Sequence, residues 1–396
     1  MRAVGAPALH CADAMRAARG AAIKMLRTTP SDSNMSADAT PPEARSAARP
    51  TRRSCLVTGG SGFLGINLIR RLMADGWEVR SLDLVPFDYP ERGSIEAIEG
   101  DIRDPTAVER AMHGVDSVVH CAAALPLAPA AEILSTGVAG TNVLLQHARA
   151  CGVDRFVFIS STAVYGIPDQ RPILESHRLV GVGAYGRSKI EAEDLCAEGR
   201  ALGQCVPVLR PKTFVGPERL GVFELLYDWA SQGRRFPVLG SGANRYQLLD
   251  VRDLCEVIVR CLVLERSRVD DTFNVAAARF GSMADNVQCI LDRAGFGRRV
   301  AHLPRWPTVA ALRVLATLGL SPLYPWIYET ADHDSEVSID KLRSHLGYIP
   351  QHSNEEALRA NFDWYLANRD RFAGRRGITH RLPWRRGVLE WAKYLY

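Results

Sequence analysis

Residues 55–65 read Cys55-Leu-Val-Thr-Gly-Gly-Ser-Gly-Phe-Leu-Gly65, a short apolar segment followed by glycines spaced three apart. The apolar segment predicts a buried strand, and residues 63–75 predict a helix that ends at Gly76. Glycines in such a turn let the backbone approach a pyrophosphate, and free N–H groups at the helix N-terminus favour its negative charge. Such turns also occur for steric reasons, so the prediction depends on the order strand, glycines, helix. We expect a dinucleotide to contact Gly59, Gly62, Phe63, Leu64 and Gly65.

The alternation of strand and helix continues beyond this loop. Further strands are predicted at residues 78–84, 95–99, 117–120 and 156–160, with helices at 106–112 and 140–150. Strands that alternate with helices predict an α/β fold with a doubly wound parallel (Rossmann) sheet. After Arg210 the alternation becomes irregular and richer in Pro, Trp and Arg, which indicates a smaller C-terminal substrate-binding lobe.

This pattern divides the chain into three parts. We predict that residues 1–53 are a disordered leader, or upstream sequence if translation begins at Met35. Residues 54–370 form the domain, with the cofactor part mainly in 54–210 and the substrate lobe mainly in 211–370. Residues 371–396 form a basic amphipathic tail, which suits either a membrane surface or a helix docked on its own domain or a partner subunit.

Composition excludes several classes of protein. The chain has 396 residues, 47% of them hydrophobic and 23% charged, as in a soluble globular protein. The net charge of +5 arises largely from arginines near the two ends, so a nucleic-acid partner is not expected. The nine cysteines form no CxxC pair and no cluster that predicts a metal site. Together with the lack of a signal peptide or a membrane-spanning run, this predicts a cytoplasmic protein.

Asp83 closes the second predicted strand, close to the spacing of about 20 residues at which an acid binds the adenosine ribose. A carboxylate there repels a 2′-phosphate, so the sequence predicts NAD rather than NADP. The alternative is that Asp83 only caps the turn before Pro86, and that Arg80 or Arg92 reaches a phosphate.

Tyr185 and Lys189 are four residues apart, which places them on one face of a predicted helix. A nearby ammonium favours the phenolate form of tyrosine, so Tyr185 can take or return a hydroxyl proton. Ser160 and Ser161 follow a predicted buried strand and are expected at the carboxyl edge of the sheet, where ligands of such folds bind. A simple turn or helix cap at the two serines is the alternative.

Together these residues resemble the extended short-chain dehydrogenase/reductase family, also called the NAD-dependent epimerase/dehydratase superfamily. The resemblance covers roughly residues 54–360. It is carried by seven motifs: Thr58-Gly-Gly-Ser-Gly-Phe-Leu-Gly65, Gly100-Asp-Ile102, His120-Cys-Ala-Ala123, Gly140-Thr-Asn-Val143, Ser160-Ser-Thr-Ala-Val-Tyr-Gly166, Tyr185-Gly-Arg-Ser-Lys189 and Arg210-Pro-Lys-Thr-Phe-Val-Gly-Pro217.

The family resemblance assigns roles to several of these residues. It implies that Ser161 orients the reacting oxygen, that Tyr185 moves its proton, and that Lys189 also holds the nicotinamide ribose. It implies further that the protein is a homodimer with a small-molecule substrate. Additional cofactor contacts are expected from Asp101 and Ile102 at the adenine, and from Ala122, Ala123, Asn142, Ser160 and Pro211.

Sequence details narrow the reaction within the family. Sugar-nucleotide 4,6-dehydratases carry an acidic pair where this chain has Thr162 and Ala163, so no carboxyl group is available there to protonate a leaving hydroxyl. Sugar-nucleotide enzymes also tend to carry Asn and Arg where this chain has Thr213 and Tyr246, although Arg245 could substitute as a phosphate ligand.

Other details resemble the 3β-hydroxysteroid dehydrogenase branch, notably Arg210-Pro211, the Phe-x-Gly-Pro217 ending and Gly240-Ser-Gly-Ala-Asn244. The sequence therefore favours a dehydrogenase acting on a lipid-like secondary alcohol, with a sugar-nucleotide epimerase and a non-catalytic NAD sensor as alternatives. A lipid-like substrate would agree with contact between the tail and a membrane. The lobe contains residues that could line such a pocket, with ordinary core as the alternative role of each: Phe223, Leu226, Tyr227, Trp229, Trp306, Leu323, Tyr324 and Trp326.

Overall fold

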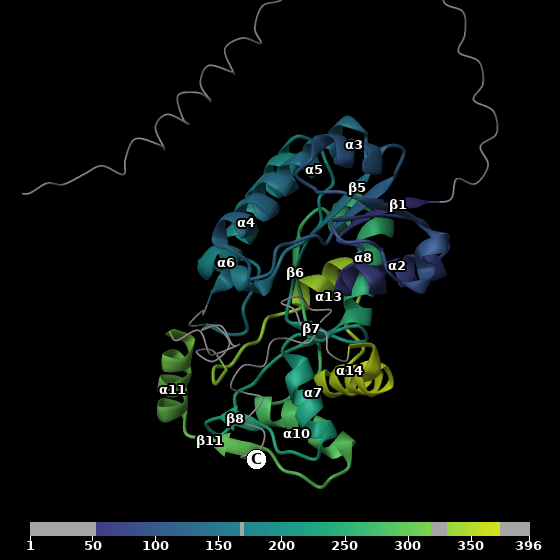
Figure 1. The fold of residues 1–396 in the computed structure, drawn as a ribbon. Coiled ribbons are helices and arrows are strands. Elements are labelled where there is room, and N and C mark those ends of the chain that lie inside the picture. The colour runs from purple at the N-terminus through teal and green to yellow at the C-terminus, as the bar shows by residue number, and fades with distance from the viewer. Residues whose placement is uncertain (1–52, 167–169, 318–330, 373–396) are drawn as a thin grey trace, which may run out of the picture. The chain divides into compact units, whose positions relative to one another are not determined.

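The central sheet contains seven parallel strands in the order β10-β6-β5-β4-β1-β2-β3. The computed structural model of the protein describes residues 53–166, 170–317 and 331–372 (Figure 1). The strands are β1 (Ser54–Thr58), β2 (Glu78–Asp83), β3 (Glu96–Glu99), β4 (Ser117–His120), β5 (Arg155–Ile159), β6 (Val208–Pro211) and β10 (Thr272–Val275). Since the strand order reverses at β1 and β4, the predicted doubly wound Rossmann sheet is confirmed.

Two apolar clusters cover the two faces of this sheet. On one face lie α2 (Phe63–Ala74), α8 (Val251–Val263) and α13 (Asp340–Leu346), and on the other lie α3 (Pro105–Met112), α5 (Thr141–Ala150) and α6 (Gly183–Ala201). Successive strand residues alternate between the clusters, with Val57 in the first and Leu56 in the second. This two-sided burial explains why the strands are apolar without a polar face.

The helix predicted at 140–150 is the last part of a longer helical segment. It begins with α4 (Ala130–Leu134) and continues through a π-helical turn, η3 (Ser135–Gly140), into α5. Gly137 and Gly140 weaken the helical pattern in the sequence, but both permit close packing. A Cβ at Gly137 would lie 2.9 Å from the hydroxyl of Ser188, and one at Gly140 would lie 2.6 Å from Ile102.

A third cluster forms the lower part of Figure 1. It contains α7 (Phe223–Ser231), α10 (Met283–Ala294) and α14 (Asn354–Asn368), with the parallel pairs β8 (Pro237–Leu239) with β11 (Ala301–Leu303) and β7 (Phe214–Val215) with β9 (Leu249–Asp250). Residues after 210 serve both regions, because α8 and β10 return to the central sheet. Short elements complete the described chain: η2 (Pro90–Ser94), η4 (Thr162–Tyr165), α9 (Arg266–Val269), α11 (Arg305–Thr317) and η5 (Arg369–Phe372).

The residues predicted to line a pocket differ in their burial. Leu226, Tyr227 and Trp229 are buried, and the first two belong to the third cluster, which Phe223 contacts. Trp306 is 80% exposed on α11. The remaining lining candidates, Leu323, Tyr324 and Trp326, lie outside the described residues. So do residues 1–52 of the predicted leader and residues 373–396 of the predicted tail.

No helix in the three described ranges is long and apolar enough to cross a membrane. Within the same ranges, no three acidic, cysteine or histidine side chains are grouped so that they could hold a metal ion.

Candidate active site

The glycine loop joins β1 to α2 where side chains would collide with backbone atoms. Gly59 has a φ of +70°, and a Cβ there would lie 2.8 Å from the backbone of Ala122. At Gly65 a Cβ would lie 2.2 Å from the carbonyl oxygen of Gly59. Gly62 is the N-cap of α2, and no side chain in the described structure caps this helix end. The uncapped N–H groups fit a pyrophosphate, to which Phe63 and Leu64 could donate from the first turn.

Asp83 is fixed beside this loop at the end of β2. Its Oδ2 accepts a hydrogen bond from the Ser61 N–H at 2.9 Å, and its Oδ1 accepts one from the Val85 N–H at 3.0 Å. Asp83 therefore caps the turn, as the alternative predicted, and is also tied to the glycine loop. The other alternative was that Arg80 reaches a phosphate of the cofactor. In the structure its Nε instead donates to Glu96 at 2.6 Å. The ribose contact of Asp83 stays a prediction.

Asp101 is held by a neighbour that the sequence analysis missed. Arg103 donates to its carboxylate from Nη2 at 2.6 Å and from Nε at 3.0 Å, and this hydrogen bonding keeps the pKa of Asp101 below its ordinary value. Arg103 also donates to the Ser135 hydroxyl at 2.9 Å. Ile102 between them is buried. The spacing of two residues between acid and arginine was the available signal, while adenine contact at Asp101 and Ile102 stays a prediction.

A buried polar chain supports the end of β4. His120 lies 2.8 Å from the Thr58 hydroxyl through Nδ1 and 3.1 Å from the Thr141 hydroxyl through Nε2. Burial lowers the pKa of His120 to about 3, so the ring is neutral. The Ala122 N–H donates to Thr58 at 3.4 Å. This chain fixes the backbone that carries Ala122 and Ala123, both of them partly exposed.

The three predicted catalytic residues come together from two elements. Lys189 and Tyr185 share one face of α6, with the ammonium 5.9 Å from the centre of the phenol ring. Ser161 caps η4 through the Ala163 N–H at 3.1 Å, and its side chain also hydrogen-bonds with Tyr185. The cap predicted as the alternative role of Ser161 is thus present together with the contact to Tyr185.

The electrostatics of this group follow from its burial. Burial raises the pKa of Tyr185, and the hydrogen bond with Ser161 opposes that rise. Burial lowers the pKa of Lys189 to about 8, and its ammonium donates to the Ile159 carbonyl at 2.8 Å. A positive charge beside the phenol stabilises its phenolate form, so the arrangement can accept a proton from an alcohol and return one to a ketone.

Behind Ser160 lies a buried ionic network that the sequence analysis also missed. The Ser160 hydroxyl donates to Glu193 at 2.5 Å, and Glu193 forms a bidentate pair with Arg210 at 2.5 and 3.0 Å. Arg210 donates to the Tyr165 hydroxyl at 2.8 Å, which donates in turn to Asn274 at 2.7 Å. Glu193 follows Lys189 by four residues on α6, a spacing that indicates a shared helix face.

The two other predicted cofactor residues lie at the same edge of the sheet. Asn142 is partly exposed in the first turn of α5 and accepts a hydrogen bond from Gln146 at 3.3 Å. Pro211 is buried at the end of β6, where its carbonyl accepts from the Thr162 hydroxyl at 3.4 Å. Their contacts with the cofactor stay predictions.

Thr213 and Tyr246, which replace the Asn and Arg typical of sugar-nucleotide enzymes, are neighbours. Their side chains form a hydrogen bond, while burial raises the pKa of Tyr246. Arg245, the alternative phosphate ligand, contacts other groups in this structure. It pairs with Glu336 at 3.0 Å and lies over the ring of Phe280 at 4.5 Å. At these two positions the structure therefore has a hydroxyl and a phenol that are bonded to each other.

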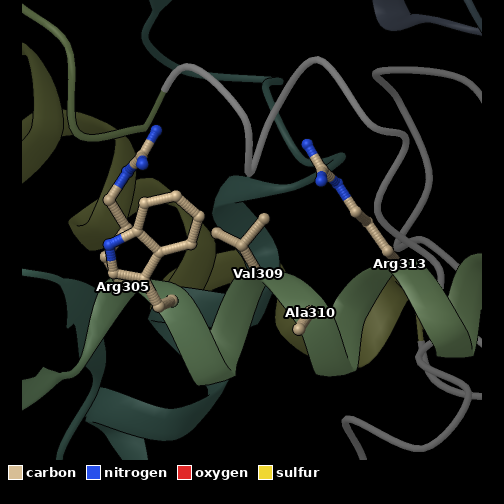
Figure 2. A pocket seen from close by; sticks show the side chains of 5 residues that line it. Arg305, Val309, Ala310 and Arg313 are labelled. Carbon is tan, nitrogen blue, oxygen red and sulfur yellow. The ribbon is translucent and has the colours of Figure 1, made fainter.

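A separate hollow of about 460 Å³ borders α11 (Figure 2). Arg305, Val309 and Arg313 lie four residues apart along this helix, and Arg305 also pairs with Asp332. The hollow is lined by Arg305, Trp306, Val309, Ala310 and Arg313. This face of α11 is therefore both basic and apolar.

Comparison with known proteins agrees with this geometry. The NAD-dependent epimerase/dehydratase family matches residues 55–276, from β1 to just beyond β10. The chain belongs to this family. Membership confirms that the protein is an NAD-dependent enzyme of the extended short-chain dehydrogenase/reductase type, as the motifs predicted.

Individual members of the epimerase/dehydratase family differ in what their names say they do. The chain is 34% identical to the uncharacterised protein y4nG of Sinorhizobium fredii, with 86% of each chain covered. It is 26% identical to a 3β-hydroxysteroid dehydrogenase/Δ5→4-isomerase of Mycobacterium tuberculosis, over 79% of this chain and 90% of that one. The solved structure of DesIV, a dTDP-glucose 4,6-dehydratase of Streptomyces venezuelae with NAD bound, is 27% identical. It covers 80% of this chain and 98% of its own, with a TM-score of 0.65.

Proposed function

We propose that the protein is an NAD-dependent dehydrogenase that reversibly oxidises a secondary alcohol on an apolar, lipid-like molecule. The observation that supports the reaction is the group formed by Ser161, Tyr185 and Lys189. In this mechanism Ser161 orients the alcohol oxygen, and the Tyr185 phenolate, which the Lys189 ammonium stabilises, takes the alcohol proton and becomes a neutral phenol. When bound, NAD supplies the hydride acceptor. Its pyrophosphate would be held at the N-terminus of α2 and its ribose by Asp83.

The substrate class is supported by the hydrogen bond between Thr213 and Tyr246. A diphosphate needs several cations or donors, and Arg245 is already paired with Glu336. The named 3β-hydroxysteroid dehydrogenase relative agrees with an apolar alcohol. The alternative is a sugar-nucleotide epimerase, since family members of that kind share the hydride step. A homodimer and a tail in contact with a membrane are further expectations for this enzyme.

NADH absorbance tests the proposal. Purified protein and NAD are mixed with two panels, one of hydroxysteroids and other apolar secondary alcohols and one of sugar nucleotides. We expect NADH to accumulate with an apolar alcohol. Isomerisation of a sugar nucleotide without net NADH would establish the epimerase instead, because an epimerase regenerates its cofactor in each cycle.

The variant Tyr185→Phe tests the roles of the residues. It should bind NAD as the wild type does and lose turnover by about 100-fold or more, as expected for removal of a general base. Full activity in this variant would contradict the mechanism. Absence of turnover in both proteins with every substrate, despite NAD binding, would favour the non-catalytic NAD sensor.

A further inference from the structure

Lys212 is a buried cation at the carboxyl edge of the sheet that the proposed mechanism does not use. It directly follows β6, and only 6% of the residue's surface is exposed. Its predecessor Pro211 accepts a hydrogen bond from Thr162, the neighbour of Ser161. Lys212 therefore follows β6, the strand next to β5, and β5 leads to the catalytic serine.

The ammonium of Lys212 has no acidic partner among the described residues. It contacts the Ser335 hydroxyl and lies 5.5 Å from the centre of the Tyr246 ring. The two carboxylates beside Ser335 are directed to other groups. Asp334 accepts from the Arg245 N–H at 2.7 Å, and Glu336 pairs with the Arg245 side chain at 3.0 Å.

A buried ammonium without a counter-ion is costly, because burial penalises the charged form. Burial lowers the pKa of Lys212 to about 8, so the side chain still carries its charge at neutral pH. An ion pair would recover part of this cost. The most direct source of such a pair is an anionic group of the ligand that enters the site.

The surroundings of Lys212 are held rigidly. Tyr246 accepts hydrogen bonds at its carbonyl from Asn354 at 2.7 Å and from Asn286 at 3.2 Å, so its backbone is fixed from two helices. Its phenol hydrogen-bonds with Thr213. The Lys212 ammonium therefore contacts the Ser335 hydroxyl and faces the Tyr246 ring, whose own hydroxyl is bonded to Thr213.

The use of lysine at this position is itself informative. Only five of the 49 basic residues are lysines, and the other 44 are arginines. Two of the five, Lys189 and Lys212, are buried at this edge of the sheet. An ammonium is a compact point charge, whereas a guanidinium is a planar fork suited to bidentate pairing. A single point charge with hydroxyl donors matches one small anionic group better than an extended diphosphate.

We propose that Lys212, with Ser335, Tyr246 and Thr213, binds a carboxylate of the substrate, which makes the substrate an apolar hydroxy acid. This deepens the proposed function and rests on it, since it names the class of secondary alcohol.

Calorimetric titration of the full chain, saturated with NAD, tests the assignment with octanoate and octanamide. The two probes have nearly the same shape and differ in charge. We expect wild-type protein to bind octanoate at least 10-fold more tightly than octanamide. Lys212→Met should bind NAD normally and lose this preference. As a matched control, Lys341→Met removes the lysine that pairs with Asp271 at 2.6 Å and should keep the preference.

Equal affinity of wild-type protein for the two probes would overturn the assignment, and this comparison needs no variant to fold. Retention of the preference in Lys212→Met would overturn it as well. The outcome is separable from that of the proposed function. A preference for octanoate is measured by binding alone, whereas the dehydrogenase is judged by NADH formation with apolar alcohols.

Discussion

Replacing Glu193 by Gln should destabilise the protein strongly, because it leaves a buried guanidinium without its counter-ion. Glu193 and Arg210 are 8% and 5% exposed. Removing one partner of a buried ion pair costs about 3 to 5 kcal/mol. Arg210 keeps its hydrogen bonds to the Tyr165 hydroxyl and the Glu175 carbonyl, and a Gln amide can still accept from Ser160. We therefore expect the lower end of that range, about 3 kcal/mol.

Urea unfolding followed by tryptophan fluorescence measures this loss in free energy. The matched control is Glu355→Gln, which breaks a pair with Arg359 whose side chains are 49% and 46% exposed. Exposed pairs contribute about 0 to 1 kcal/mol, so the control should stay close to the wild type. If the free energy of unfolding of Glu193→Gln is within about 1 kcal/mol of the wild-type value, the ion pair does not contribute the stability that its burial implies.

Three shorter predictions concern the cofactor site. Gly65→Ala should abolish NAD binding, measured by fluorescence titration, because the added Cβ would lie 2.2 Å from a backbone atom of the loop. As a control, Gly93→Ala should bind NAD normally, because a Cβ at Gly93 has no neighbour within 4 Å. Asp83→Asn should raise NADP-dependent activity relative to NAD by about 10-fold or more, and an unchanged ratio would exclude a ribose contact. Between pH 6.5 and 4.5 the wild type should lose free energy of unfolding, and His120→Asn should reduce this loss by about 2 to 3 kcal/mol, measured by urea unfolding. The reason is that a histidine with a lowered pKa binds its proton only on unfolding, so wild-type stability falls as the pH drops below 6.5.

The sheet and the catalytic helix could be predicted because their signals are local. The apolar runs of β1, β4 and β5 and the spacing between Tyr185 and Lys189 each lie within a few residues. The helix predicted at 140–150 omits α4 and most of η3, a segment in which Gly137 and Gly140 lower the helix propensity. Their benefit, close packing against Ser188 and Ile102, comes from residues distant in sequence.

The supports of the site were harder to predict for the same reason. The role of Glu193 depends on its ion pair with Arg210. The role of Lys212 depends on its contact with Ser335, a residue 123 positions further along the chain. Neither partner can be identified from spacing. The replacement of two sugar-nucleotide positions by Thr213 and Tyr246 was visible in sequence, but their hydrogen bond to each other was not.

Asn354, fully buried at the start of α14, has a consequence for how such enzymes diversify. It donates to the carbonyl of Tyr246 and accepts from the Leu248 N–H at 2.9 Å, so a late segment of the chain positions the wall beside Lys212. The part matched by the family ends at residue 276, well before Asn354. Changes in the segment from Ser335 to Asn354 can therefore reshape the surroundings of Lys212 without altering Ser161, Tyr185 or Lys189, the residues proposed to move the proton.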